Sequence, residues 1–215
     1  MKSLVKTALF MLISTTLLLG NNKYDKAMSK AMSKLNEATT LEDYNQVANQ
    51  FDRIASATED EWLPVYYVAY TRVMMAVLEE GPKNKDTFLD EAQKKLDILE
   101  SMDHDVPERL VLQGFHHMIR ISVDPGSRGA TLGQDCGMVL NQAYQMNNQN
   151  PRVLLMLAQF NFGASSYMGT DTSGPCAMFD EALKLFESPR DSNSDKFLPS
   201  WGKDMTLVMQ KQCQG

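Results

Sequence analysis

Three histidines are the residues of this chain whose chemistry is most versatile. His116 and His117 are adjacent, and His104 lies between Asp103 and Asp105. Imidazole and carboxylate groups are ordinary ligands of zinc and nickel. Neighbouring side chains on a helix point about 100° apart, however, so His116 and His117 cannot both bind one ion from the same helix without distortion. We therefore expect packing and capping roles and assign no metal site; a metal-binding protein or hydrolase that uses this histidine cluster is the alternative.

The chain lacks the patterns that nucleophilic catalysis and phosphate binding use. It contains no Gly-x-Ser-x-Gly elbow, and the glycines at 126, 129 and 133 do not follow a strand. Arg128 and Arg152 lie near turns, where an arginine binds either a ligand carboxylate or helix-end carbonyls. The structural bond is the favoured interpretation. We expect a protein that is not an enzyme and has no cofactor.

The chain has three cysteines, which permit one disulfide and one free thiol. Cys176 lies at the start of one expected helix and Cys213 at the end of the next. In an antiparallel hairpin the two would lie side by side, which makes them a disulfide candidate that leaves Cys136 as a buried thiol. Three buried thiols are the alternative.

Charge and the first residues bear on location and partners. Lys2 and Lys6 precede an apolar run, Ala8 to Leu19, that is much shorter than the roughly 20 residues that span a bilayer. We expect residues 1–20 to be a secretory signal, with an uncleaved anchor as the alternative, and residues 21–215 to form a single domain that is periplasmic or secreted, with no transmembrane span. Without its two lysines the chain keeps 19 basic side chains against 27 acidic ones, which disfavours nucleic acid as a partner.

Apolar spacing predicts helices and no strands. Apolar residues recur at i, i+3, i+4 and i+7 almost throughout, and capping residues, prolines and glycines divide the chain. The expected helices are Tyr24–Glu37, Leu41–Ala57, Glu61–Glu79, Asp86–Met102, Val106–Ser122, Thr131–Met146, Arg152–Tyr167, Pro175–Ser188 and Trp201–Cys213.

The helices repeat with a period near 45 residues. A large apolar residue recurs at Phe51, Leu96, Leu140 and Phe186, and a small residue follows each of the first three after 18 positions, at Ala69, Gly114 and Ala158. Such self-similarity is typical of stacked helical hairpins that present a binding surface.

The pattern resembles the tetratricopeptide repeat, which has a large-small pair in its first helix and an alanine followed by an aromatic residue in its second. Val68-Ala69 and Leu157-Ala158 correspond to the first element, and Ala92 with Leu96 to the second. The period is longer than that of the family and also suits HEAT-type repeats, and we place the extra residues in loops within each hairpin, at Glu80–Phe88, Asp124–Thr131 and Gly169–Gly174.

Most of the chain is also similar to a group of exported tetratricopeptide-like proteins of bacterial envelopes, through segments such as Trp62–Tyr67, Asp124–Gly129 and Asn150–Arg152. The resemblance implies an all-α, right-handed superhelix of about four hairpins with a C-terminal capping helix. It also implies a binding or assembly role without a defined reaction.

The first helices of the hairpins carry a second apolar stripe, the inner stripe, which should line the concave side of the array. We expect it to be a groove that grips a peptide or protein partner, with Arg152 pairing an acidic group at one end, unless the loops within the hairpins cover it. A self-assembling scaffold is a further alternative. The inner stripe consists of Tyr66, Tyr70, Val73, Val111, Phe115, Met118, Leu155, Gln159 and Phe162.

Overall fold

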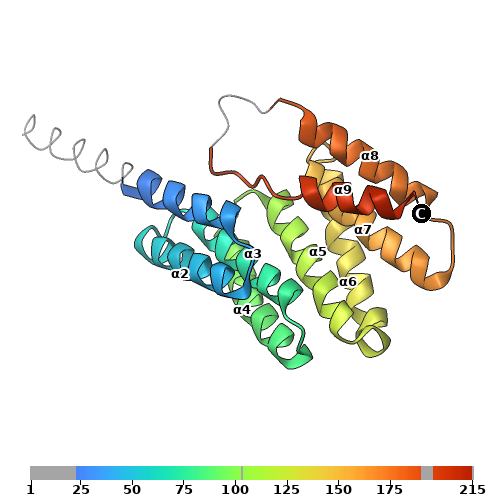
Figure 1. Ribbon diagram of the computed structural model, residues 1–215, viewed down its shortest axis with the longest axis horizontal. Coiled ribbons are helices and arrows are strands. Elements are labelled where there is room, and N and C mark those ends of the chain that lie inside the picture. The colour runs from blue at the N-terminus through green and yellow to red at the C-terminus, as the bar shows by residue number, and fades with distance from the viewer. Residues whose placement is uncertain (1–22, 103, 190–195, 215) are drawn as a thin grey trace, which may run out of the picture.

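The computed structural model describes residues 23–102, 104–189 and 196–214, and every regular element in these ranges is a helix (Figure 1). The expected signal at 1–20 and Asp103 lie outside the described residues. No described helix is long and apolar enough to cross a membrane. The described helices are residues 23–37, α2 (Leu41–Ala57), α3 (Trp62–Leu78), α4 (Pro82–Met102), α5 (Val106–Val123), α6 (Pro125–Met146), α7 (Pro151–Met168), α8 (Ser173–Glu187) and α9 (Lys203–Gln212).

Two helices begin earlier than their sequence predicts. We expected α4 from Asp86 and α6 from Thr131, because Pro82 and Pro125 looked like helix breaks. Both prolines instead occupy the first position of their helix, where proline loses no hydrogen bond and its fixed φ suits the helix. The Asp124 carboxylate caps α6 by accepting a hydrogen bond from the Ser127 amide at 3.2 Å. The extra residues of the long period therefore lengthen the second helices to 21 and 22 residues, and the expected loops at Glu80–Phe88 and Asp124–Thr131 are wrong.

Consecutive helices pair into hairpins. The most extensive contacts are those of α3 with α4 and of α5 with α6, followed by α2 with α3 and α7 with α8, while α3, α5 and α7 also touch one another in sequence. An inner layer is formed by α3, α5 and α7, which are buried along much of their length. Helix 23–37 and α2 lie at one end of the array, and α8 and α9 at the other (Figure 1).

The small positions of the repeat are contact points between helices. Gly114 on α5 lies so close to Leu140 on α6 that an added Cβ would be 2.3 Å from Leu140 Cδ2. Ala69 and Ala158, the equivalent residues of α3 and α7, are fully buried. The 18-residue spacing read from the sequence thus marks buried positions on α3, α5 and α7, and at Gly114 a close contact with α6.

The C-terminal segment returns across the array rather than extending it. After residue 196 the chain passes over the inner helices, and α9 then packs on α8. Trp201, expected in the last helix, instead precedes it, because Gly202 takes a left-handed φ of 112° before α9 begins. Cys176 and Cys213 are joined by a disulfide with a Cα–Cα distance of 5.8 Å, which fastens the end of α9 to the start of α8. Cys136 is a buried thiol, and burial raises its pKa to about 12.

Candidate functional site

The inner stripe is buried, which corrects the expectation of an open groove. Of its nine residues, Tyr66, Tyr70, Val73, Val111, Phe115 and Leu155 are at most 6% exposed, and Met118, Gln159 and Phe162 are half-buried. The cover is the C-terminal segment, not the turns within the hairpins. Trp201 stacks on Tyr70 with ring centroids 5.1 Å apart and on Phe115 at 5.9 Å. The protein's own chain therefore occupies the surface that we assigned to a partner.

Hydrogen bonds anchor the segment to the inner helices. The Trp201 indole N–H donates to the Tyr66 hydroxyl at 2.9 Å, and that hydroxyl donates to Glu108 at 3.3 Å. The Tyr67 hydroxyl donates to the Phe197 carbonyl oxygen at 2.7 Å. Burial, followed by the nearby Glu108 carboxylate, holds the pKa of Tyr66 well above its usual value, so its hydroxyl keeps the proton that it donates.

Arg152 does not face a ligand, contrary to expectation. Its guanidinium donates to both oxygens of Glu108, from Nε at 2.9 and 3.0 Å and from Nη2 at 2.6 Å. Asn150 also donates to Glu108, and both members of the ion pair are less than a tenth exposed. Burial alone would lower the pKa of Arg152, but the Glu108 carboxylate outweighs it and raises the pKa. The pair joins α5 to α7 beneath Trp201 and is unavailable to an external acid.

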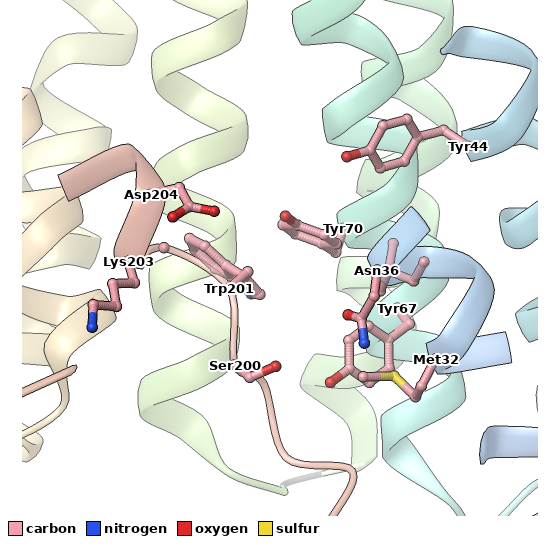
Figure 2. Close-up of a pocket in the computed structure, with 11 residues that line it drawn as sticks. Met32, Asn36, Tyr44, Tyr67, Tyr70, Ser200, Trp201, Lys203 and Asp204 are labelled. Carbon is pink, nitrogen blue, oxygen red and sulfur yellow. The ribbon is translucent and has the colours of Figure 1, made fainter. Parts of the chain in front are cut away.

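Beside Trp201 a small opening remains, the aromatic slot. Its volume is about 210 Å³, and Figure 2 shows Tyr44, Tyr70 and Trp201 around it, with Asp204 and Lys203 on the side of α9. Burial raises the pKa of Tyr70 and that of Tyr44, so both phenols stay protonated. Small-molecule sites usually have volumes of roughly 300–1,000 Å³, so the slot as it stands is too small for a large ligand.

The histidines are held by protein groups. His116 Nε2 lies 3.0 Å from the Leu89 carbonyl oxygen, and His117 Nε2 lies 3.2 Å from the Gln113 side-chain amide. Burial lowers the pKa of His116 to about 4 and also lowers that of His117, so both rings are neutral near pH 7. His104 is exposed. Within the described ranges, no three His, Cys, Asp or Glu side chains are grouped so that they would hold a metal ion.

Arg128 makes the expected structural bond to a helix-end carbonyl, that of Arg120 in the last turn of α5, and an ion pair with Asp86 in addition. Its guanidinium donates to both carboxylate oxygens of Asp86, at 2.7 and 2.8 Å, and to the Arg120 carbonyl oxygen at 3.2 Å. The contact ties the start of α6 to the start of α4, and the Asp86 pKa is lowered chiefly by this hydrogen bond.

A larger opening lies between helix 23–37 and α2, and our sequence analysis did not find it. This basic cleft has a volume of about 540 Å³. The lysines of helix 23–37, at positions 23, 26, 30 and 34, follow helical spacing and were the available signal. The sequence does not reveal which residues of α2 lie opposite them, because that depends on how the two helices pack. The lining residues are Lys23, Tyr24, Ala27, Lys30, Gln50, Arg53, Ile54, Ala57 and Thr58.

Comparison with known proteins gives one informative match. No protein-family model and no curated sequence matches the chain. Among solved structures, the chain superposes on the HusA haemophore from Porphyromonas gingivalis with a TM-score of 0.78 and 25% identity, over 89% of this chain and 92% of the other. The two proteins share a fold. The match extends along nearly the whole of both chains, so it includes the hairpins and not merely one helical pair.

Proposed function

We propose that this protein is an exported, non-enzymatic binding protein whose ligand is haem or a related planar tetrapyrrole. The observation that carries the proposal is the superposition on a haemophore over nearly the full length of both chains. A haemophore is, by its name, a carrier of haem. Export agrees with the signal that we expect at residues 1–20, and it makes the protein periplasmic or secreted.

The groups that would otherwise suggest catalysis are engaged in packing and internal bonds. Cys136 is buried with a pKa of about 12, so its thiol is not ionised near neutral pH, and thiolate is the nucleophilic form. Glu108 is occupied by Arg152. His116 is bonded to a backbone carbonyl and has a depressed pKa, so it would be a poor general base.

We further propose that the hairpins form a right-handed, tetratricopeptide-like superhelix. The serial contacts of α3, α5 and α7, together with the close approach of Gly114 to Leu140, support this arrangement. Such an array offers surfaces along its whole length, which suits a carrier.

The test is an absorbance titration of the purified protein with haem, followed in the Soret band. We expect saturation at one haem per protein with a dissociation constant of about 1 μM or tighter. A linear, non-saturating change, equal to that given by an unrelated helical protein, would refute the proposal.

A protein or peptide ligand remains the second candidate, and one observation favours it. The inner stripe already holds an extended segment of polypeptide, with Trp201 against Tyr70 and Phe115. A fluorescent peptide with the sequence of residues 196–202 should then bind the Trp201→Ala variant more tightly than it binds the wild type, because the wild type fills the groove with its own chain. Equal polarisation changes for both proteins would exclude this candidate.

A further inference from the structure

The basic cleft has a size that fits a large ligand. Its 540 Å³ falls within the range of roughly 300–1,000 Å³ that small-molecule sites occupy, whereas the aromatic slot does not reach that range. The cleft lies beside helix 23–37, on α2, and is therefore separate from the inner stripe that the C-terminal segment covers.

The lining combines an apolar floor with a cationic rim. Ile54 is 9% exposed, and Tyr24 and Ala27 are half-buried beside it. Lys23, Lys30 and Arg53 are exposed at the edge, and no carboxylate lines the cleft. The acidic residues at 59–61 follow Thr58 in sequence but do not line it. A ligand that matches this surface has an apolar body and negative charge at its edge.

The charges of the cationic rim gather around one cleft whose lining contains no acidic side chain. The chain carries a net charge of −6, and acidic partners are abundant. Eight arginines and lysines elsewhere form ion pairs, among them Lys196 with Asp25 of helix 23–37. Within the described residues, Lys23, Lys30 and Arg53 form no ion pair. Charges left unpaired around one apolar cleft, in an acidic protein, are complementary to an anionic ligand.

We infer that the basic cleft is the tetrapyrrole site, in which Lys23, Lys30 and Arg53 bind the carboxylates of the macrocycle and the apolar floor covers part of its face. This inference rests on the proposed function and adds the location and the charge requirement. Haem has two carboxylates on one edge and an otherwise apolar ring, so a single ligand satisfies both parts of the lining.

The experiment compares ligands and variants that differ only in charge. Haem and its dimethyl ester are titrated against the wild type, against Lys30→Glu/Arg53→Glu and against the control Lys83→Glu/Lys184→Glu, which makes the same change of net charge at exposed positions on α4 and α8. Exposed ion pairs are individually weak, so two reversed charges should weaken haem binding by about tenfold. The ester should bind the wild type about tenfold more weakly than haem does, and the difference between the two ligands should vanish in the cleft variant. The control should change less than about twofold, and added salt should weaken haem binding to the wild type.

Each failure has a distinct meaning. If neither haem nor ester binds the wild type saturably, the proposed function fails, and this inference with it. If haem binds but the ester binds equally well, or the cleft variant keeps its affinity, the inference alone is overturned. Displacement of haem by an equimolar long-chain fatty acid would identify an acyl anion as the occupant and would overturn the choice of a tetrapyrrole.

A second variant tests the apolar floor without changing charge. Ala57 ends α2 and lines the cleft with an exposed side chain, so Ala57→Trp should fill the cleft while sparing the protein core. We expect haem affinity to fall at least fivefold with an unchanged unfolding midpoint. Unchanged affinity would place the ligand elsewhere.

Discussion

Gly114→Ala tests the contact that gives the repeat its small position. A methyl group at this site would lie 2.3 Å from Leu140 Cδ2, 2.6 Å from its Cγ and 3.2 Å from its Cδ1. The first two distances are far below a normal carbon–carbon contact of about 3.5–4.0 Å. Leu140 is fully buried, so its side chain has no free space into which to rotate. The helices α5 and α6 must therefore separate, or Leu140 must adopt a strained rotamer.

Two opposing terms set the size of the effect. Alanine favours a helix over glycine by about 1 kcal/mol, while overpacking a core typically costs about 1–3 kcal/mol. Because two of the contacts are so short, we expect the upper part of that range and a net loss of about 1–2 kcal/mol. For a chain of this size such a loss corresponds to roughly 2–8 °C in the thermal midpoint.

The assay is urea and thermal unfolding followed by circular dichroism at 222 nm. Gly163→Ala on α7 is the matched control, because nothing lies within 4 Å of its added Cβ. The control should gain up to about 1 kcal/mol from helix propensity alone. In the Gly114→Ala/Leu140→Ala double variant, removal of the Leu140 side chain should relieve the clash, so the two losses should be less than additive by about 1 kcal/mol or more. A Gly114→Ala protein as stable as the Gly163→Ala control would refute the reasoning.

Three further predictions concern buried groups. Burial depresses the folded-state pKa of His116 to about 4, below the unfolded value of 6.5, so its contribution to stability is present above pH 6.5 and is lost as the pH falls towards 4. For this group the loss between pH 7 and pH 4 is on the order of 3 kcal/mol. The His116→Gln variant should therefore lose less of its resistance to urea than the wild type does over the same pH range. Loss of the Cys176–Cys213 bond in a double serine variant should cost about 2–4 kcal/mol, and alkylation of the denatured, unreduced wild type should modify Cys136 alone, as read by mass spectrometry. Trp201→Ala should destabilise the fold by about 2–4 kcal/mol while leaving haem affinity unchanged; weaker or tighter haem binding would move the ligand site towards the aromatic slot.

Local signals predicted most of the helices, and the errors have a common cause. Thr40 and Asp43 form a capping box at the start of α2, and Asn150 caps α7 ahead of Pro151; both are signals that can be read along the chain. Pro82 and Pro125 were misread because proline both ends helices and begins them, and only the packing of the following residues decides between these roles. Once the residues after Pro125 pack along α5, starting the helix at the proline satisfies more backbone groups than a loop would.

The candidate site was less accessible to sequence analysis. The inner stripe, which helical spacing predicts, includes Tyr66, Tyr70 and Phe115, and all three contact Trp201. Nothing in that spacing says what covers a stripe. The cover comes from Trp201, 131 residues beyond Tyr70 in the chain, and the stacking of these two rings depends on the path of the C-terminal segment.

The sequence by itself determined the helical class and the period near 45 residues, because both follow from residue size and spacing along one chain. Only the tertiary structure decided that Arg152 forms an ion pair with Glu108 and that Trp201 covers the inner stripe. It also decided that Arg53 lines the same open cleft as Lys23 and Lys30. The physical reason is that periodicity fixes which face of a helix a residue occupies. The partner of that residue lies on helices and segments distant in sequence, and their packing depends on the free energy of the whole fold.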